Sequence, residues 1–312
     1  MKTRMTTQTR TPLKTLAFAT FLVLSTSAIA QSDATDVEAL REAAVDALIT
    51  APPERALPLA RKVVEGDYSD DLKEKALFVL SQIDEPEAQE IVLSAARHGS
   101  GDLQEEAIRM IGISGNRDAM AQLGALFVEG NEDVREAILE AYMIADDEDA
   151  VYQIAVTADS SETFENAVEM LGVMGAHDKL RQLRDQLPSD DSDVSEALIE
   201  AYAISGDFES LRAWATDSSD SKRQEQAIEG LGIIGGSKAD QVLAEIYRTS
   251  PVEDVREAAL EGLMISGNDT LMLELYKASD DAGEKKMLLE YLVIMDSDEV
   301  WQIIDQALDG GL

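Results

Sequence analysis

The chain has 312 residues, and its 62 acidic residues outnumber the 26 basic ones to give a formal net charge of −36. A surface this acidic repels phosphate backbones and anionic lipid head groups, which disfavours nucleic-acid binding. The sequence holds no cysteine, so disulfides, thiolate nucleophiles and thiolate metal sites are excluded.

Two interpretations of the acidic surplus stay open. In the first, the acids only solvate helix faces, as suits a saline habitat. In the second, they favour a basic partner or bound divalent cations. Disorder is disfavoured because 45% of the residues are hydrophobic and recur with a regular period.

The first thirty residues have the pattern of a secretory signal peptide. Four basic residues and no acidic one lie within residues 2–14, and residues 16–24 form a short apolar core. Residues 28–30 are a small-x-small site, so we expect cleavage after Ala30 and a mature chain in the periplasm or outside the cell. The apolar core is too short for an ordinary membrane span, which favours cleavage over an uncleaved anchor.

Residues 33–66 predict an irregular first unit of the mature chain. Thr35 with Glu38 would form a capping box, and Pro53 would open a second helix as its first residue. An atypical unit is expected at this place, because a terminal repeat must cover a core that would otherwise be exposed.

From about residue 70 onward the chain repeats itself roughly every thirty residues. The copies share an alanine or, in the last copy, a methionine: Ala76, Ala107, Ala137, Ala167, Ala197, Ala227, Ala258 and Met287. A fixed period of this length is typical of a solenoid, in which similar supersecondary units stack on one another.

Each unit predicts a helix, a turn, a second helix and a turn. In residues 131–160, Asn131 is an N-cap, apolar residues at three- and four-residue spacings follow, and Asp149 would cap the second helix. Ser221 with Gln224 would form a capping box in a later unit. Glycines that suit a left-handed helix end recur inside the units, at Gly115, Gly175, Gly206, Gly235 and Gly267. Prolines are predicted to stay out of helix interiors, at unit edges: Pro86, Pro188 and Pro251.

Side-chain volume alternates between neighbouring units. Five residues after the shared alanine, Gly172 and Gly232 alternate with Tyr142 and Tyr202. We expect each bulky side chain to face a gap left by its neighbour, and a true period of about sixty residues, which is a duplicated pair of units.

The units resemble HEAT repeats, in particular the short type found in phycocyanobilin lyases and many bacterial proteins. The resemblance rests on the rhythm E-A-h-x-x-h-x-x-h-G-D/N, with h apolar, best seen in residues 195–207 and 256–269, and covers about residues 70–310. It implies an all-α, right-handed α-solenoid of about eight or nine helical hairpins within residues 31–312. Tetratricopeptide repeats, the alternative, have a longer period and a Trp…Leu-Gly…Tyr spacing that this chain lacks.

No residue pattern predicts catalysis, a cofactor or a metal site. His98 and His177 lie more than two units apart, no G-x-S-x-G elbow occurs, and no glycine-rich phosphate loop occurs. Acidic clusters at residues 146–149, 190–193 and 217–220 have two interpretations, as helix caps or as oxygen ligands for calcium, but none has the spacing of an EF-hand.

The second helices carry the predicted contact residues, since the resemblance implies that these helices line the concave surface. A residue of varying size precedes a recurring glutamine at Ala121, Tyr152, Arg181 and Trp301. Tyrosine, tryptophan and arginine are the usual interface anchors. The residues predicted to bind a partner are Tyr152, Arg181, Trp214, Tyr247 and Trp301. The alternative for Trp214 and Trp301 is packing between repeats.

The sequence therefore predicts a non-catalytic, exported scaffold without cofactor or metal, which binds protein or peptide partners, basic ones in particular, along its concave surface. It predicts no nucleic-acid partner and no membrane insertion after signal cleavage. Two alternatives stay open: an acidic, divalent-cation-binding envelope protein, and a lyase-like enzyme, which the resemblance favours. The sequence makes no prediction of the oligomeric state.

Overall fold

The computed structural model describes residues 36–99, 101–187 and 192–308, and every secondary-structure element in these ranges is helical. The chain divides into two compact units, unit 1 (Met1–Ser114) and unit 2 (Gly115–Leu312). The predicted signal peptide and its cleavage site lie outside the described residues. In the described part of the chain, no helix combines the length and the apolar character needed to cross a membrane.

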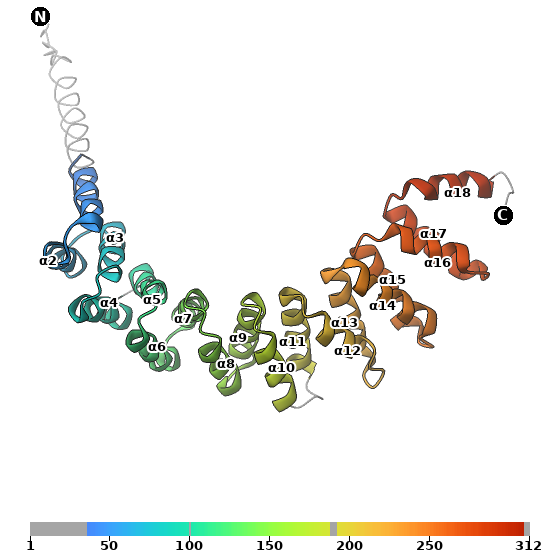
Figure 1. The fold of residues 1–312 in the computed structure, drawn as a ribbon, viewed down its shortest axis with the longest axis horizontal. Helices are drawn as coiled ribbons and strands as arrows, with labels where there is room; N and C mark the ends of the chain where they lie inside the picture. The colour runs from blue at the N-terminus through green and yellow to red at the C-terminus, as the bar shows by residue number, and fades with distance from the viewer. Residues whose placement is uncertain (1–35, 100, 188–191, 309–312) are drawn as a thin grey trace, which may run out of the picture. The chain divides into compact units, whose positions relative to one another are not determined.

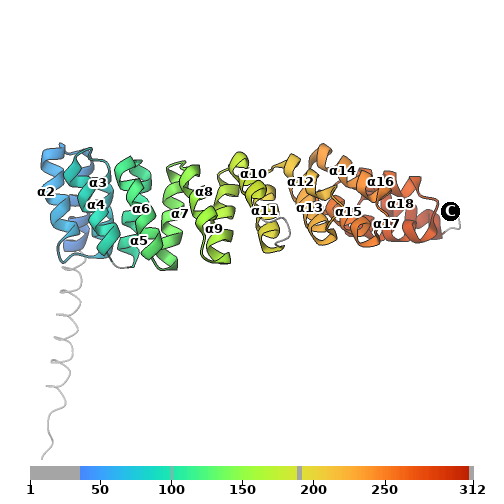
Figure 2. The same cartoon turned by 90° about the horizontal axis from the view of Figure 1, so that it is seen from below.

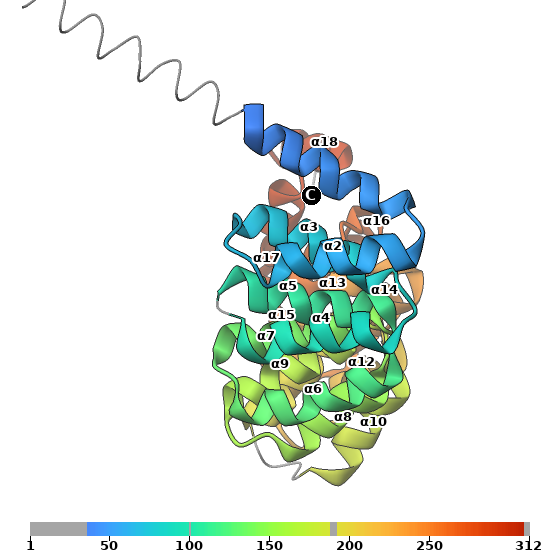
Figure 3. The same cartoon turned by 90° about the vertical axis from the view of Figure 1, so that its left-hand side faces the viewer.

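Unit 1 consists of helices that pack against their neighbours in the chain, as the end-on view shows (Figure 3). A helix over residues 36–46 runs into a 3-10 turn, and four α-helices follow: η1 (Ala47–Thr50), α2 (Pro53–Val64), α3 (Asp70–Ser81), α4 (Pro86–His98) and α5 (Asp102–Ser114). Pro53 opens α2 as predicted, whereas Pro58 lies inside α2, so the predicted exclusion of proline from helix interiors is wrong there. Thr35 of the predicted capping box lies outside the described residues.

Unit 2 begins with α6 (Arg117–Glu129) and continues with helical hairpins (Figure 1). The first helices are α7 (Glu132–Ile144), α9 (Ser161–Val173), α11 (Ser192–Ser205), α13 (Ser221–Ile234), α15 (Glu253–Ile265) and α17 (Ala282–Ile294). The second helices are α8 (Glu148–Thr157), α10 (His177–Gln186), α12 (Phe208–Ala215), α14 (Gly236–Thr249), α16 (Asp269–Ala278) and α18 (Asp298–Leu308). Within unit 2 the first helices form one layer and the second helices another, and the buried apolar residues lie between them (Figures 1 and 2).

The first helices of unit 2 all end at a left-handed residue. In α7 the Asp147 amide donates to the Tyr142 carbonyl oxygen at 2.9 Å and the Asp146 amide donates to Met143 at 3.0 Å, which is a Schellman motif. The residues with positive φ at this position are Asp146, Gly175, Gly206, Gly235, Gly267 and Asp296. The predicted glycine turns are thus confirmed, and two aspartates occupy the same position.

These turns correct the register of the repeats. The left-handed residue follows Ala167 by eight residues but Ala137 by nine. Counted back from the turn, one position holds a large buried side chain in every repeat: Tyr142, Leu171, Tyr202, Leu231, Leu263 and Leu292. The alternation of side-chain volume therefore arises because repeats that are aligned on their alanines are out of register by one residue. The expectation that bulky residues face glycine gaps is wrong.

The glycines instead let helix backbones touch. A Cβ atom on Gly172 of α9 would lie 2.9 Å from Cα of Ala201 in α11, and one on Gly232 of α13 would lie 2.7 Å from Cα of Gly262 in α15. The same contact thus recurs after two repeats, in agreement with the longer period. Because these first helices approach so closely, they lie on the inner side of the bend within unit 2 (Figure 1), where the resemblance had implied second helices.

The structure confirms one of the predicted N-cap residues and corrects two others. Asn131 caps α7 as predicted, with its side chain accepting from the Val134 amide. The cap of α8 is Asp147 and not Asp149, because Asp147 is the residue directly before the helix. Asp220 caps α13, so the capping box predicted for Ser221 is wrong, and the side chain of its partner Gln224 donates to the Ala215 carbonyl oxygen.

Candidate interaction surface

Two of the predicted contact residues are buried between hairpins. Tyr152 in α8 is 8% exposed, and the ammonium group of Lys179 lies 5.3 Å from the centre of its ring. Tyr247 in α14 is 3% exposed, and its hydroxyl donates to Glu284 in α17 at 2.6 Å. Burial and then this hydrogen bond raise the pKa of Tyr247, so the phenol stays protonated. Tyr152 thus joins its hairpin to the next one, and Tyr247 joins α14 to the first helix of the second hairpin after its own.

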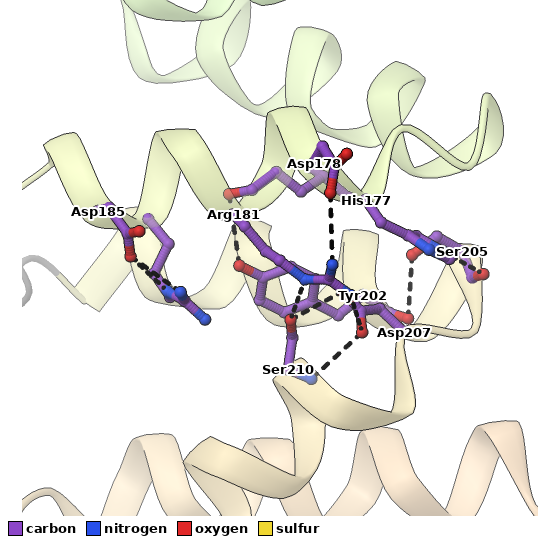
Figure 4. A network of polar contacts seen from close by, with 10 residues as sticks. His177, Asp178, Arg181, Asp185, Tyr202, Ser205, Asp207 and Ser210 are labelled. Carbon is purple, nitrogen blue, oxygen red and sulfur yellow. Dashed lines mark hydrogen bonds and ion pairs between the residues drawn. The ribbon is translucent and has the colours of Figure 1, made fainter.

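Arg181 in α10 is the centre of a polar network (Figure 4). Its guanidinium donates to both carboxylate oxygens of Asp207, at 2.9 and 2.8 Å, and Asp207 is only 3% exposed. Ser210 donates its hydroxyl to the same carboxylate at 2.8 Å. Beside this network, His177 opens α10, and its Nε2 donates to the Ser205 carbonyl oxygen at 3.0 Å.

This network locks α10 to the start of α12. Burial raises the pKa of the Asp207 carboxyl, but the hydrogen bonds from Arg181 and Ser210 outweigh burial, so the pKa lies below its ordinary value of 3.8. The carboxylate also caps α12 by accepting from the Ser210 amide. Arg181 therefore compensates a buried charge, which is a structural task.

The two tryptophans reach solvent to different degrees. Trp214 in α12 is half-buried, packs edge-on against Tyr202 with ring centres 5.6 Å apart, and lies under the guanidinium of Arg223. Trp301 in α18 is 51% exposed, and its Nε1 donates to Asp296 at 3.2 Å. The five predicted residues thus lie on five different second helices, each with local partners, and partner binding by them stays a prediction.

A second set of residues, which the sequence-based reasoning missed, recurs on the first helices of unit 2. Two residues before each left-handed turn lies an exposed β-branched side chain, and together we name these residues the β-branched row. The row consists of Ile144, Val173, Ile204, Ile233, Ile265 and Ile294, with exposed fractions from 42 to 68%. Ile113 of α5 holds the same position in unit 1. Counting back from the glycine turns, rather than forward from the alanines, is the signal that finds the row.

The fold does not require apolar residues in this row. In a Schellman motif the apolar contact involves a residue two positions earlier, which is Tyr142 in α7. That position is buried in every repeat, whereas the row is exposed. Branching at Cβ also lowers helix propensity slightly. Exposed isoleucine or valine thus recurs at one position in each first helix of unit 2, which makes the row a candidate contact surface.

Acidic residues lie beside the β-branched row. Four residues before each of its members, one helical turn away, is a glutamate, and these form the glutamate row: Glu140, Glu169, Glu200, Glu229, Glu261 and Glu290. One further turn back, five of the six first helices carry another glutamate: Glu136, Glu165, Glu196, Glu225 and Glu257. These glutamates therefore form two ordered rows on the first-helix face.

Crevices between neighbouring first helices bring these rows together. One of about 300 Å³ between α9 and α11 is lined by Glu165, Glu169, Glu196 and Glu200 among others. The next, between α11 and α13, is lined by both Glu200 and Glu229 and by Ile233 of the β-branched row. Burial and then the charges of Glu196, Glu169 and Glu165 raise the pKa of Glu200. The carboxylates of this face thus repel one another, and a cation placed among them relieves the repulsion.

Two of the acidic clusters singled out in the sequence each supply one helix cap. Asp147 caps α8, Asp220 caps α13, and Asp217 accepts from the Ser219 amide. In the cluster at residues 190–193, residues 190 and 191 lie outside the described residues. Among the residues that the structure does describe, no group of three or more His, Cys, Asp or Glu side chains is placed to hold a metal ion.

The fold and this surface define a class of protein, an all-α repeat scaffold with a repeated exposed face. The sequence model of the HEAT repeats family matches residues 57–143 and 207–264. These ranges of the chain therefore consist of HEAT repeats, as the resemblance predicted. No curated protein matches the sequence.

Several solved structures are similar to the chain. The complex of CpcE and CpcF of phycocyanin lyase from Nostoc sp. PCC7120 shares 20% identity over 79% of this chain and 95% of that chain, with a TM-score of 0.34. Human deoxyhypusine hydroxylase in complex with glycerol shares 16% identity over 77% of this chain and 96% of that chain, with a TM-score of 0.35. The family assignment rests on the sequence match and not on these superpositions.

Proposed function

We propose that this HEAT-repeat protein is a non-catalytic, exported scaffold that binds a protein or peptide partner along the first-helix face of unit 2. The β-branched row carries this proposal, because it recurs, exposed, in each first helix of unit 2. The flanking glutamates favour a basic partner, whose association they accelerate at low salt. Export is inferred from the first thirty residues alone.

The experiment compares two variants of the tagged mature chain in crosslinked capture from an envelope extract. The row variant carries Val173→Thr, Ile204→Thr, Ile233→Thr and Ile265→Thr; threonine keeps the branch at Cβ and removes apolar surface. The control variant carries Val128→Thr and Val156→Thr, which change exposed valines on second helices. We expect a specific protein to be captured by the parent chain and the control and to be lost from the row variant. Equal capture by all three chains, each with an unchanged melting temperature, would disprove the assignment of the face.

A second candidate function is cation binding by the acidic face. The pKa of Glu200, raised by burial and then by the charges of Glu196, Glu169 and Glu165, favours it, since divalent cations relieve repulsion between carboxylates. Calorimetric titration of the mature chain with calcium decides between the two: stoichiometric binding that raises the melting temperature supports this candidate, and weak, diffuse binding contradicts it.

A further inference from the structure

The first helices from α9 to α15 form two close pairs. Helix α9 packs closely on α11, and α13 packs closely on α15, through the backbone contacts that Gly172 and Gly232 permit. In contrast, α7 contacts α9 only slightly and α15 contacts α17 only slightly, so the end helices complete no such pair. The close packing of this face is therefore concentrated at two places.

Each close pair encloses a crevice, and matching residues line the two crevices. Five acidic residues line the crevice of about 300 Å³ between α9 and α11: Glu165, Glu169, Asp193, Glu196 and Glu200. Their counterparts in the next pair line the crevice of about 480 Å³ between α13 and α15: Glu225, Glu229, Asp254, Glu257 and Glu261. An amide side chain, Asn166 or Gln226, accompanies each set. The same set of groups thus occurs twice on the first-helix face.

The junction between the two pairs is different. The crevice between α11 and α13 measures about 180 Å³ and shares its carboxylates with the walls of the other two: Glu196, Glu200 and Glu229. Lys222 of α13 reaches across this junction and donates to Glu196 at 3.4 Å. Two complete acidic sets therefore flank a smaller crevice that adds no carboxylate of its own.

Both pairs also carry exposed apolar surface. Val173 and Ile204 of the β-branched row belong to the first pair, and Ile233 and Ile265 belong to the second. Ile265 lines the crevice between α13 and α15 together with the glutamates. A lysine or arginine side chain complements this combination, because its cationic head lies among carboxylates while its stem contacts apolar surface. The smaller of the two matching crevices has room for on the order of ten water molecules, which is more space than one such side chain needs.

We propose that the first-helix face of unit 2 holds two like docking sites for one partner polypeptide. The first site is the crevice between α9 and α11 with Val173 and Ile204, and the second is the crevice between α13 and α15 with Ile233 and Ile265. Each site accepts one basic side chain and an apolar neighbour, so the partner presents two such basic elements. This inference rests on the proposed function and specifies its partner.

Isothermal titration calorimetry at low salt counts the sites. The probe is a short peptide with one basic element, acetyl-Leu-Arg-Leu-amide, and we expect two copies to bind each mature chain. Glu165→Gln with Glu169→Gln changes only the first site, and Glu257→Gln with Glu261→Gln changes only the second, since the crevice between α11 and α13 is lined by other glutamates. Each of these variants should bind one copy.

A matched control separates the two sites from charge alone. Glu129→Gln with Glu274→Gln removes the same charge from exposed positions on second helices and should leave two copies bound. Binding of one copy or of many copies to the parent chain would overturn the inference. An equal response of the control and the site variants would overturn it as well.

Linking two probes tests whether one partner uses both sites. Two copies joined by a long, flexible Gly-Ser linker should bind as one molecule per chain and at least about tenfold more tightly than the single probe, and either site variant should remove that gain. The absence of any gain would overturn the assignment of both sites to one partner. In that case, loss of the captured protein from the row variant would still support the proposed function, so the two failures are distinguishable.

Discussion

The two layers of unit 2 differ in the residues that lie near the C-termini of their helices. At the exposed position before the turn, the first helices carry only isoleucine or valine. One residue before the C-cap, where most members of the row lie, the second helices α8, α10, α12, α14 and α16 carry neither isoleucine nor valine; the residues there are Thr157, Gln186, Ala215, Thr249 and Ala278. The residue type thus varies in the second layer. Its constancy in the first layer makes the row a candidate contact surface.

Two junctions of the second layer are held by different polar contacts. Asp207 is compensated by Arg181, whereas the buried Asp240 accepts from Asn268 at 2.7 Å through one oxygen. The other oxygen of Asp240 has no hydrogen-bond partner among the described residues. Such different locks favour one order of repeats over others, since a buried carboxylate tolerates only the neighbour that satisfies it.

The largest effect is expected where the first helices touch. In Gly172→Leu the new side chain would meet the backbone of Ala201, where even a Cβ would lie 2.9 Å from Cα. We expect the free energy of unfolding to fall by about 3 kcal/mol, the upper end for overpacking. Urea denaturation measures it. Val173→Leu, at the adjacent exposed position, is the control and should leave the midpoint unchanged; an unchanged midpoint for Gly172→Leu would refute the backbone contact.

A smaller effect is expected from the lock in the second layer. Arg181→Ala leaves Asp207 buried without its cation. Because the Arg181 side chain is 38% exposed, water can reach the carboxylate that is left behind, and the loss is smaller than for a fully buried ion pair. We expect the free energy of unfolding to fall by about 2 kcal/mol. Arg212→Ala, which breaks an exposed ion pair with Glu209, should cost much less in the same denaturation experiment.

The same lock has a defined dependence on pH. The pKa of Asp207 is lower in the folded chain than its ordinary value of 3.8, so its contribution to stability is present above that value and is lost as the pH falls through the folded pKa. We expect the difference in stability between the parent and Asp207→Asn to shrink below about pH 4. A difference that stays constant from neutral to acidic pH would contradict the charged lock.

The smallest effect concerns the crowding of carboxylates on the first layer. Because the folded pKa of Glu200 is raised, its charge costs stability as the pH rises through its ordinary value of 4.5, so Glu200→Gln should raise the melting temperature slightly at neutral pH. Glu196 is the matched control. Hydrogen bonds from Gln226 and Lys222 lower its pKa, so Glu196→Gln should lower the melting temperature. Shifts of the same sign in differential scanning calorimetry would show that crowding is not the cause.

Local patterns in the sequence were enough for the helices, the left-handed turns and the HEAT repeats. The apolar face of a helix and the glycine that ends it each depend on residues within about four positions of one another, so a short stretch of sequence is enough to predict them. The five predicted contact residues were chosen by type, which does not reveal burial. Tyr152 and Tyr247 are buried because a neighbouring hairpin covers them, and no local pattern records that neighbour.

By itself, the sequence determined an all-α HEAT-repeat chain, its period and its acidic character, because these follow from short-range spacing and composition. Only the tertiary structure decided which alignment of the repeats is correct, which layer lies inside the bend of unit 2, and which side chains stay exposed. The physical reason is that Gly172 meets Ala201 and Arg181 meets Asp207 across nearly thirty residues, through contacts that exist only when the hairpins stack. The β-branched row became visible only when those contacts had set the register.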